Sequence, residues 1–323
     1  MTLPELLRHS SRTFALGIEQ LPVALRVPTT VAYLLLRVSD YLEDNEEMPA
    51  GRKVALLRSW DAVLAGREGA QGLVAQLPGS TLGSANPDAQ VATHTALVVD
   101  ALQALPSGAR EAILPHVRDS TQGMARWVER GPRVPEEGDL DDYMHEVAGR
   151  VGYLLTDLFA WYSNTIRKRR DYLMPLAREF GLALQTVNII RGMRADRLRG
   201  WIFIPDTFCA QVGVTREQVF LPEYRAQALK VLDMLTQKAE RHLRAAERYV
   251  SALPVWQHRV RLFCLFPLMF AARTLAISRS NQQVFEDEAK ITRDEVRRIV
   301  RDTTRWGWRN GWIVRYAQQL ARR

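Results

Sequence analysis

The sequence is poor in cysteine and lacks any zinc-type spacing of histidines. Only Cys209 and Cys264 occur in 323 residues, and they do not form a CxxC pair. This excludes a disulfide-stabilised scaffold and makes a reducing compartment, the cytoplasm, the expected location. The six histidines are scattered along the chain, which excludes a recognisable zinc site. We therefore expect a protein that is stabilised by its hydrophobic core.

Long hydrophobic runs are also missing. Because no stretch of about 18 uncharged apolar residues occurs, we expect no membrane-spanning helix. The most apolar segment, residues 262–276, is short and contains Arg273. The first fourteen residues lack the apolar core and cleavage site of a secretory signal.

Strand-type alternation and the GxGxxG motif of dinucleotide-binding folds are absent as well. Almost every segment has the helical period, which predicts an all-α fold, and the length of 323 residues suits one large domain or two small ones. The net charge of 44 − 36 = +8 permits an anionic substrate, nucleic acid or a membrane surface as partner, and selects none of them. No clustered nucleic-acid motif is found, so we expect no nucleic-acid partner.

The helical period also predicts where the helices lie. Residues 66–89, rich in Gly, Ser, Pro and Asn, are expected to form a surface loop. Pro267 is expected to kink the most apolar helix. The predicted helices span residues 2–8, a stretch after residues 10–14 that ends near residue 21, and residues 31–45, 54–65, 91–105, 109–130, 140–162, 172–197, 217–252 (as one or two helices), 262–277 and 293–323.

The central stretch, residues 31–45, is an apolar run that leads into carboxylates. At about 100° per residue, four side chains fall on one narrow helix face: Tyr33, Arg37, Asp40 and Asp44. Glu43 lies about 80° away. Such a face is either the solvated side of a soluble helix or a divalent-metal site. Mg²⁺ prefers oxygen ligands and takes one or two carboxylates with water and substrate phosphates, and Arg37 would suit the same phosphate.

A second polar face interrupts the apolar helix predicted at residues 172–197. It consists of Gln185, Asn188 and Asp196, with Arg191 flanking it. Side-chain amides on an apolar helix need hydrogen-bond partners. These partners are either other groups of the protein or a bound ligand. A third feature, the pair Gly149 and Gly152, is costly inside a helix, by about 1 kcal/mol each relative to Ala. The pair indicates either close helix packing or a thin wall beside a ligand.

Six short motifs occur in order along nearly the whole chain. They are Ser11-Arg12-Thr13-Phe14; Leu35-Leu36-Arg37 to Asp40-x-x-Glu43-Asp44; Tyr143 with Val147-Ala148-Gly149-x-Val151-Gly152; Gln185-x-x-Asn188-Ile189-Ile190-Arg191; Phe263-Cys264-x-x-Pro267; and Asn281-Gln282-Gln283-Val284-Phe285 leading to Lys290-Ile291. Together they resemble the squalene/phytoene synthase family. The last two motifs resemble squalene synthases more than phytoene synthases.

The resemblance implies one domain over residues 1–323, a single all-α bundle around a deep central cavity. In the family, acid-rich motifs bind diphosphates through Mg²⁺, and two prenyl diphosphates are joined head to head through a cyclopropyl diphosphate. Squalene synthases then reduce that intermediate with NADPH. The implied substrate is farnesyl diphosphate, the implied cofactor is Mg²⁺, and NADPH is a candidate second cofactor.

The resemblance also assigns roles to residues. Asp40, Glu43 and Asp44 would hold Mg²⁺, with Asp40 and Asp44 at the site where the diphosphate ionises. Arg12, Arg37 and Arg191 would contact diphosphate, and Gln185 would join them in binding substrate. Tyr143 would lie near the reacting carbons and assist proton removal. Asn188 and Lys290 would lie near NADPH or the second diphosphate, and Phe263 would line the cavity.

The chain departs from the family in its second acidic motif. Family members carry Asp-x-x-Glu-Asp after the Asn-Ile-Ile-Arg run, whereas residues 192–196 here read Gly-Met-Arg-Ala-Asp. Gly192 and Ala195 replace two acids, Arg194 adds a positive charge, and Asp196 is the remaining candidate metal ligand. Arg194 could contact a phosphate in place of a metal ion, but Arg and Mg²⁺ interact with phosphate differently. The altered motif therefore argues against the family's usual reaction of two diphosphates.

Three hypotheses follow from the intact first motif and the altered second one. The chain is a squalene synthase-type enzyme that condenses two farnesyl diphosphates to presqualene diphosphate and squalene. Alternatively, it is a prenyltransferase that uses one prenyl diphosphate and a neutral acceptor, such as an aromatic molecule. The third hypothesis is a non-catalytic protein that binds a prenyl chain or acts as a scaffold.

The end of the chain, residues 305–323, combines Trp with basic residues. Such a helix is a candidate for peripheral contact with an anionic membrane surface. The alternative is a terminal helix that packs its Trp face on the bundle.

Overall fold

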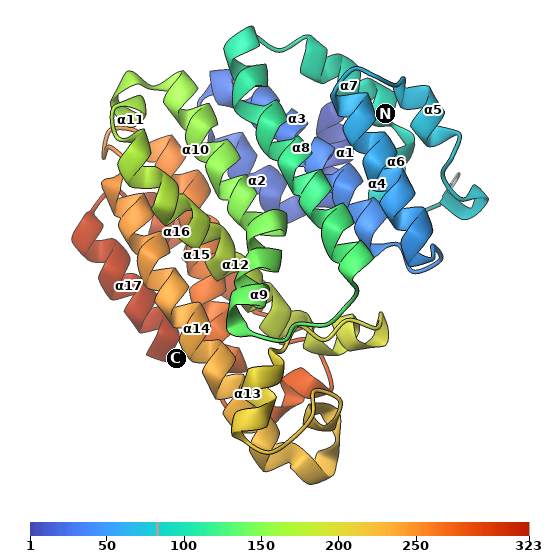
Figure 1. The fold of residues 1–323 in the computed structure, drawn as a ribbon. Coiled ribbons are helices and arrows are strands. Elements are labelled where there is room, and N and C mark those ends of the chain that lie inside the picture. Colours follow the sequence, from blue (N-terminus) through green and yellow to red (C-terminus); the bar gives the residue numbers. More distant parts are fainter. Residues whose placement is uncertain (82–83, 323) are drawn as a thin grey trace. The chain divides into compact units, whose positions relative to one another are not determined.

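The computed structural model describes residues 1–81 and 84–322, and the side chains of all of these except Arg12 and Thr13. Within these residues the regular structure is entirely helical and contains no strand (Figure 1). The predicted all-α class is therefore confirmed.

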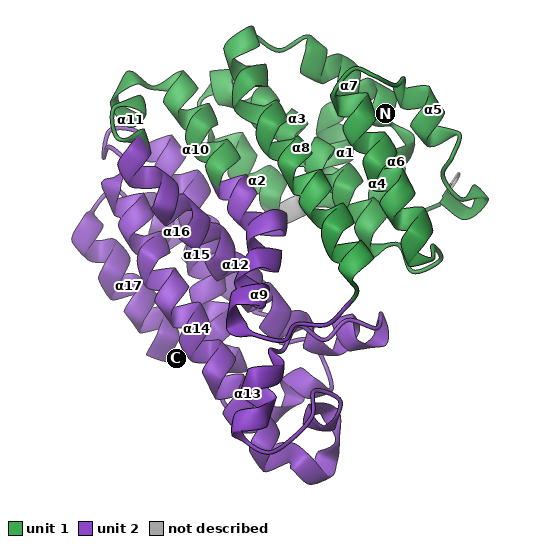
Figure 2. Cartoon of the chain, in the orientation of Figure 1, with its two compact units in different colours: residues 1–131, 153–170 green, residues 132–152, 171–323 purple. Residues whose placement is uncertain are grey.

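The chain forms two compact units (Figure 2). Unit 1 comprises residues 1–131 and 153–170, and unit 2 comprises residues 132–152 and 171–323. Each unit takes its residues from separated parts of the chain. The single domain expected over residues 1–323 stays a prediction.

Unit 1 is built around α3, the helix that contains the central stretch of the sequence. The hydroxyl groups of Ser39, on α3, and Thr121 are joined by a hydrogen bond of 2.8 Å. Ser39 Oγ also accepts a hydrogen bond from Trp60 Nε1 at 3.1 Å. All three residues are fully buried, so this polar contact fixes the register of α3 against α4 and α8. The helices are α1 (Leu3–Ser10), α2 (Arg12–Gln20), α3 (Val23–Asp44), α4 (Ala50–Leu64), α5 (Ala70–Val74), α6 (Pro87–Thr93), α7 (Thr95–Gln103), α8 (Ser107–Arg130), α10 (Arg150–Tyr162, from residue 153) and α11 (Asn164–Arg167), with a 3₁₀ turn at Gly79–Thr81.

Unit 2 is built around α15, which packs against α14, α16 and α17. Its helices are α9 (Glu137–Met144), a π-helical turn (His145–Gly149), α12 (Arg170–Leu198), α13 (Asp206–Gln211), α14 (Arg225–Ala252), α15 (His258–Ser278), α16 (Arg293–Trp306) and α17 (Asn310–Arg322), with 3₁₀ turns at Gln218–Phe220, Pro222–Tyr224 and Gln282–Phe285.

Helix α15 is the one described helix that is long and apolar enough to cross a membrane. Its residues 262–276 were identified from the sequence as the most apolar segment and set aside because the segment is short and contains Arg273. However, 72% of its most apolar window is buried inside the protein, which is typical of a core helix. Pro267 lies inside α15, and the helix continues to Ser278.

Several predicted boundaries were wrong. The loop expected at residues 66–89 contains α5 and the first residues of α6, and the helix expected at residues 91–105 is divided at His94. The helix expected at residues 293–323 is divided at Gly307, where a Cβ atom would lie 2.6 Å from Leu265 Cδ1. The contact with α15 selects glycine at this turn, a reason that is invisible in the local sequence.

Gly152, from the predicted glycine pair, and Gly181, on α12, lie where two backbones touch. A Cβ atom at Gly152 would lie 2.1 Å from the carbonyl oxygen of Ala177, and one at Gly181 would lie 2.3 Å from the carbonyl oxygen of Ala148. The segment around the π-helical turn therefore packs directly on α12. Of the two interpretations of these glycines, the structure supports close helix packing.

We predict that Gly152→Ala lowers the free energy of unfolding by about 2–3 kcal/mol, because the added methyl would overlap backbone atoms that cannot move aside. Denaturant unfolding measures this. Gly138→Ala, on α9, is the matched control, since nothing lies within 4 Å of its Cβ position. The control should be neutral or stabilising, and equal losses in the two variants would contradict the backbone contact.

Candidate functional site

A first group of candidate site residues lies in unit 1, where α3 and α6 meet at Arg37. Its Nη1 lies 3.3 Å from Asp40 Oδ2 and its Nε lies 3.6 Å from Asp88 Oδ1. Its Nη2 donates a hydrogen bond of 3.1 Å to the hydroxyl of Tyr33, whose ring stacks on Phe14 at 5.1 Å between centroids. The predicted helix face is thus confirmed for Tyr33, Arg37 and Asp40. We call Arg37, Asp40, Asp44 and Asp88 the acidic cluster.

Asp88 was missed by the sequence reasoning. It lies in the first turn of α6, where the side chain of Asn86 accepts hydrogen bonds from the N–H groups of Asp88 and Ala89, and Pro87 is the first helical residue. An Asn cap followed by Pro and an acid is a helix-start signal. The expectation of a loop to residue 89 hid this signal.

The acidic cluster carries more negative charge than Arg37 neutralises. Burial raises the pKa of Asp40 to about 6; Arg37 opposes this rise, while Asp44 and Asp88 add to it. Burial also raises the pKa of Asp88, with Arg37 opposing and Asp44 adding. Although burial opposes its charged form, the pKa of Arg37 is raised by Asp40, Tyr33 and Asp88. A divalent cation would relieve the repulsion among the carboxylates.

Glu43 and Asp44, in the last turn of α3, face different surroundings. Glu43 is buried and its backbone carbonyl accepts a hydrogen bond from Lys53 Nζ at 2.7 Å, whereas Asp44 is exposed. Within the residues that the structure describes, no group of three or more His, Cys, Asp or Glu is arranged to hold a metal ion. The donor set is all oxygen, which fits Mg²⁺ that arrives with a diphosphate and needs one or two carboxylates. The metal-binding roles of Asp40, Glu43 and Asp44 stay predictions.

A second group of candidate site residues lies in unit 2, on α12 and the segment after α15. Arg191 Nε lies 2.9 Å from Glu288 Oε1, and Lys290 Nζ lies 2.6 Å from the other oxygen of Glu288. Asn188 is exposed and donates a long hydrogen bond of 3.5 Å to Gln185 Oε1. The structure therefore brings Arg191 and Lys290 together through Glu288, and Asn188 together with Gln185. The sequence motif did not predict Glu288.

Two side chains of the altered motif, Arg194 and Asp196, pair with other groups of the protein. The Asp196 side chain pairs with Arg199, the residue directly after α12. Arg194 donates a hydrogen bond to the backbone carbonyl of Glu286, whose carboxylate pairs with Arg225 at 2.7 Å. To bind a metal, Asp196 would have to exchange Arg199 for the ion. Its assignment as a metal ligand stays a prediction.

Tyr143 belongs to an aromatic stack in unit 2. Its ring lies 4.5 Å from the ring of Phe203 at 20° between planes, and Trp201 stacks on Phe203 at 5.3 Å. Tyr143 and the predicted cavity residue Phe263 are both nearly buried. Sequence reasoning treated residues 200–205 only as the end of α12 and so missed Trp201 and Phe203. The side chain of Arg12, also predicted to bind substrate, lies outside the described part of the chain.

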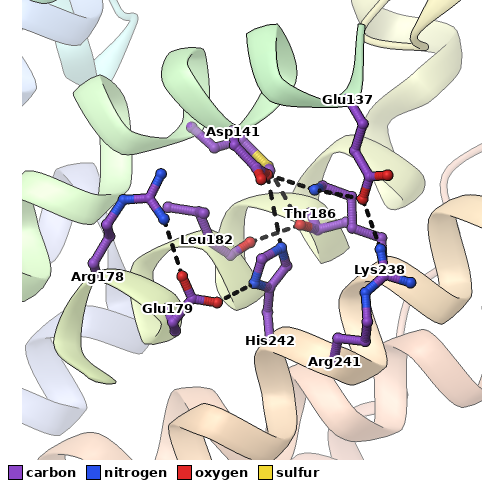
Figure 3. A network of polar contacts seen from close by, with 10 residues as sticks. Glu137, Asp141, Arg178, Glu179, Leu182, Thr186, Lys238, Arg241 and His242 are labelled. Atoms are coloured by element: carbon purple, nitrogen blue, oxygen red, sulfur yellow. Dashed lines mark hydrogen bonds and ion pairs between the residues drawn. The ribbon is translucent and has the colours of Figure 1, made fainter. Parts of the chain in front are cut away.

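The helix that carries Tyr143 is held by a buried lysine. Lys238 of α14 is 1% exposed, and its Nζ lies 3.0 Å from Glu137 Oε1 and 2.5 Å from Asp141 Oδ1, both on α9 (Figure 3). Arg241 also reaches Glu137, at 2.6 Å. Burial would raise the pKa of Glu137, but Lys238 and Arg241 lower it. These ion pairs anchor α9 to α14, and the nearer of the two carboxylates, Asp141, lies two residues before Tyr143.

The same network extends to α12 through His242. Its Nδ1 lies 2.6 Å from Glu179 Oε2, and its Nε2 lies 3.8 Å from Asp141 Oδ1 (Figure 3). Hydrogen bonding from His242 lowers the pKa of Glu179, and Arg178 contributes. Three helices, α9, α12 and α14, are thus joined by these polar contacts.

Comparison with protein families gives a match over most of the chain. A family model described as squalene/phytoene synthase matches residues 7–295. The squalene synthase of Schizosaccharomyces pombe is 28% identical over 304 residues, which cover 92% of this chain and 63% of that protein. A Botryococcus braunii protein named Botryococcus squalene synthase is 28% identical, covering 91% of this chain and 61% of its own length. The chain thus spans less than two thirds of these two relatives. Human squalene synthase is 28% identical over 98% of this chain and 72% of its own length.

Comparison with solved structures shows the same fold. A complex of TcSQS with the ligand BPH1237 has a TM-score of 0.83, with 24% identity, over 98% of this chain and 89% of that one. A dehydrosqualene synthase in complex with a ligand has a TM-score of 0.67, with 19% identity, over 94% of each chain. These likenesses confirm the helical architecture that the sequence motifs led us to expect.

The raised pKa of Asp40 predicts a stability that depends on pH. A raised pKa favours folding at low pH, and this contribution is lost as pH rises from about 4 through about 6. In metal-free buffer, Asp40→Asn should therefore raise the free energy of unfolding by about 1–2 kcal/mol at pH 7.5 and leave it unchanged at pH 4.

Asp61→Asn is the control of opposite sign. Burial would raise the pKa of Asp61, but hydrogen bonds from Arg118 and Gln122, with Arg67 nearby, lower it. Its substitution should destabilise the protein at pH 7.5, and the loss should fade as pH falls below the usual Asp range. Thermal or denaturant unfolding across pH measures both variants. A destabilising effect of Asp40→Asn at neutral pH would refute the excess of negative charge in the acidic cluster.

We also predict that Lys238→Met destabilises unit 2 by about 3–5 kcal/mol, because Glu137 and Asp141 would lose the cation that compensates them. Lys230→Met, at an exposed position of the same helix, should change stability by no more than about 0.5 kcal/mol. Urea unfolding monitored by circular dichroism compares the two. Similar effects in both would mean that the buried ion pairs do not hold α9.

Proposed function

Because the chain belongs to the squalene/phytoene synthase family, we propose that it is a Mg²⁺-dependent prenyltransferase that joins two farnesyl diphosphates head to head. The product would be presqualene diphosphate and, after reduction, squalene. The observation that carries this proposal is the acidic cluster, which places an arginine among three carboxylates at the end of an otherwise apolar helix. A diphosphate leaves only when its developing charge is neutralised by groups that are already in position.

In this proposal the acidic cluster serves the first diphosphate. Asp40 and Asp44 would hold Mg²⁺, with Glu43 close by on the same turn. The metal, when bound, would neutralise charge on the departing diphosphate. Arg37 would contribute its planar fork to the phosphate oxygens, and the contacts with Asp88 and Tyr33 keep the guanidinium in a fixed orientation. Arg12, by its place in the family motif, would add a second cation.

The aromatic stack would serve the allylic cation that remains. Such a cation must be kept from water, and the faces of Tyr143, Trp201 and Phe203 attract positive charge without acting as nucleophiles. The Tyr143 hydroxyl would assist proton removal when the new carbon–carbon bond closes. Phe263, nearly buried on α15, would add to the apolar lining.

The second diphosphate would be held mainly by side-chain cations. Arg191 and Lys290, joined through Glu288, would contact it together with Gln185 and Asn188. Two of the three expected acids are absent from this motif, so it would hold fewer metal ions than the family pattern does. For the reductive step, Lys290 and Asn188 would face the phosphates of NADPH.

A second candidate function follows from the altered motif. Asp196 is already paired with Arg199, which favours an enzyme that uses one prenyl diphosphate and transfers its prenyl group to a neutral acceptor. This candidate requires one diphosphate site, whereas the first requires two. Isothermal titration with a non-reactive farnesyl diphosphate analogue therefore separates the candidates by stoichiometry.

We predict that the purified protein converts farnesyl diphosphate with Mg²⁺ to a thirty-carbon diphosphate, and to a thirty-carbon hydrocarbon when NADPH is added. Mass spectrometry identifies the products. Asp40→Asn should lower kcat by roughly 10²–10³-fold, because it removes a carboxylate from the acidic cluster. Asp100→Asn, on the exposed side of α7, should leave activity unchanged.

Two results would contradict the proposal. Full activity of Asp40→Asn would remove the acidic cluster from the chemistry. A folded protein that binds one equivalent of analogue and forms no thirty-carbon product would instead favour transfer to a neutral acceptor.

A further inference from the structure

Two connections of unit 2 are held together by one buried arginine. They are residues 253–257, between α14 and α15, and residues 307–309, between α16 and α17. The Arg261 guanidinium, which is fully buried, donates hydrogen bonds to three neutral acceptors: the Leu253 carbonyl at 2.7 Å, the Gly307 carbonyl at 3.3 Å and Asn310 Oδ1 at 2.6 Å. The Asn310 amide donates in turn to the Ser251 carbonyl at 3.1 Å. The two connections therefore lie side by side in a fixed arrangement.

These two connections expose large apolar side chains. Trp256 is 68% exposed, Val255 46% and Trp308 44%. Trp is seldom left this exposed without a partner, because its indole ring has a large apolar surface. We call Val255, Trp256 and Trp308 the aromatic tip. A fixed tip with two exposed indole rings is typical of an interaction surface.

The surroundings of the aromatic tip are uniformly basic. The sequence contains no Asp or Glu from residue 248 to residue 285, and none from residue 303 to the end. Arg259, Arg305 and Arg309 are exposed. Arg309 stacks over the Trp308 ring at 4.5 Å, and Arg305 stacks over the Trp306 ring at 5.1 Å. The two segments that form the tip thus combine indole rings with cations and contain no Asp or Glu, the nearest acids before them along the chain being Glu247 and Asp302.

The rest of the terminal helix is not available for the same purpose. Helix α17 buries Ile313, Tyr316, Ala317 and Leu320, and Trp312 stacks on Tyr316 at 4.4 Å between centroids. For the helix itself, the interpretation as a packed terminal helix is therefore supported. The exposed surface is instead the tip at the start of α17, and it includes Trp256, which lies fifty residues earlier in the sequence.

We propose that the aromatic tip docks unit 2 on an anionic phospholipid bilayer. Trp256 and Trp308 would sit among the headgroups, where an indole ring can bury its apolar part and keep its N–H in a polar layer. Arg259, Arg305 and Arg309 would lie against the lipid phosphates. The charge of the tip complements this partner, and a bilayer accepts exposed indoles without needing a matching groove. This inference does not depend on the reaction proposed above.

Sedimentation with vesicles tests the proposal on the full chain. Native protein should bind vesicles of phosphatidylcholine mixed with phosphatidylglycerol, with an affinity that falls as salt is added. Trp256→Ala/Trp308→Ala should lower the partition coefficient at least about tenfold. Arg305→Gln/Arg309→Gln should lower it about 25-fold on the anionic vesicles, since each arginine near such a surface contributes about 1 kcal/mol.

Two variants serve as matched controls. Arg293→Gln/Arg297→Gln removes the same charge from α16, but ~12–18 Å along the helix from Arg305, which exceeds the screening length of about 10 Å at 0.1 M salt, the concentration for this comparison. Tyr172→Ala removes an aromatic ring that is 60% exposed on α12. Both controls should bind the mixed vesicles within about twofold of native protein, with unchanged circular dichroism.

Three outcomes would overturn the proposal. The first is that native protein fails to bind the mixed vesicles at low salt. The second is that the tip variants bind as well as the controls do. The third is that analytical ultracentrifugation shows a native oligomer that Trp256→Ala/Trp308→Ala dissociates, which would make the tip a contact between copies of this chain.

Discussion

The structure depends on placing charged groups at the ends of helices that are otherwise buried. In unit 1, α3 is packed on almost every side, yet it ends in the acidic cluster, where one arginine faces three carboxylates. Burial makes each charge expensive unless it has a partner, so the pKa of Asp40 is raised to about 6. In the proposed function, a divalent cation would relieve this repulsion.

Unit 2 uses charge in the opposite way, with ion pairs that are complete. Lys238 and His242 connect α9 to α14 and α12 through carboxylates, and the glycine contacts at Gly152 and Gly181 bring the backbones together beside them. This combination holds Tyr143 in its aromatic stack. The altered motif follows the same pattern, because Asp196 and Arg194 have partners inside the protein. The charges of the acidic cluster in unit 1 are thus only partly compensated within the protein, whereas Arg194 and Asp196 of the altered motif in unit 2 are paired.

Arg261 shows a third use of a buried charge. Its guanidinium is held by neutral acceptors alone, and burial lowers its pKa to about 10. The arginine fixes two surface connections that otherwise have little secondary structure, and so the aromatic tip has a defined shape. The same side chain thus belongs to the core of unit 2 and supports its most exposed apolar surface.

The sequence by itself determined the helical class, the family and the arrangement of Tyr33, Arg37 and Asp40, because helical periodicity and short motifs are local properties of the chain. Only the tertiary structure decided which partners those residues meet. Asp88 joins Arg37 from a separate helix, Glu288 joins Arg191 to Lys290, Phe203 and Trp201 stack on Tyr143, and Trp256 lies beside the turn that carries Trp308. Each of these contacts links residues far apart in the sequence. Their distances depend on helix packing, which no spacing along the chain records.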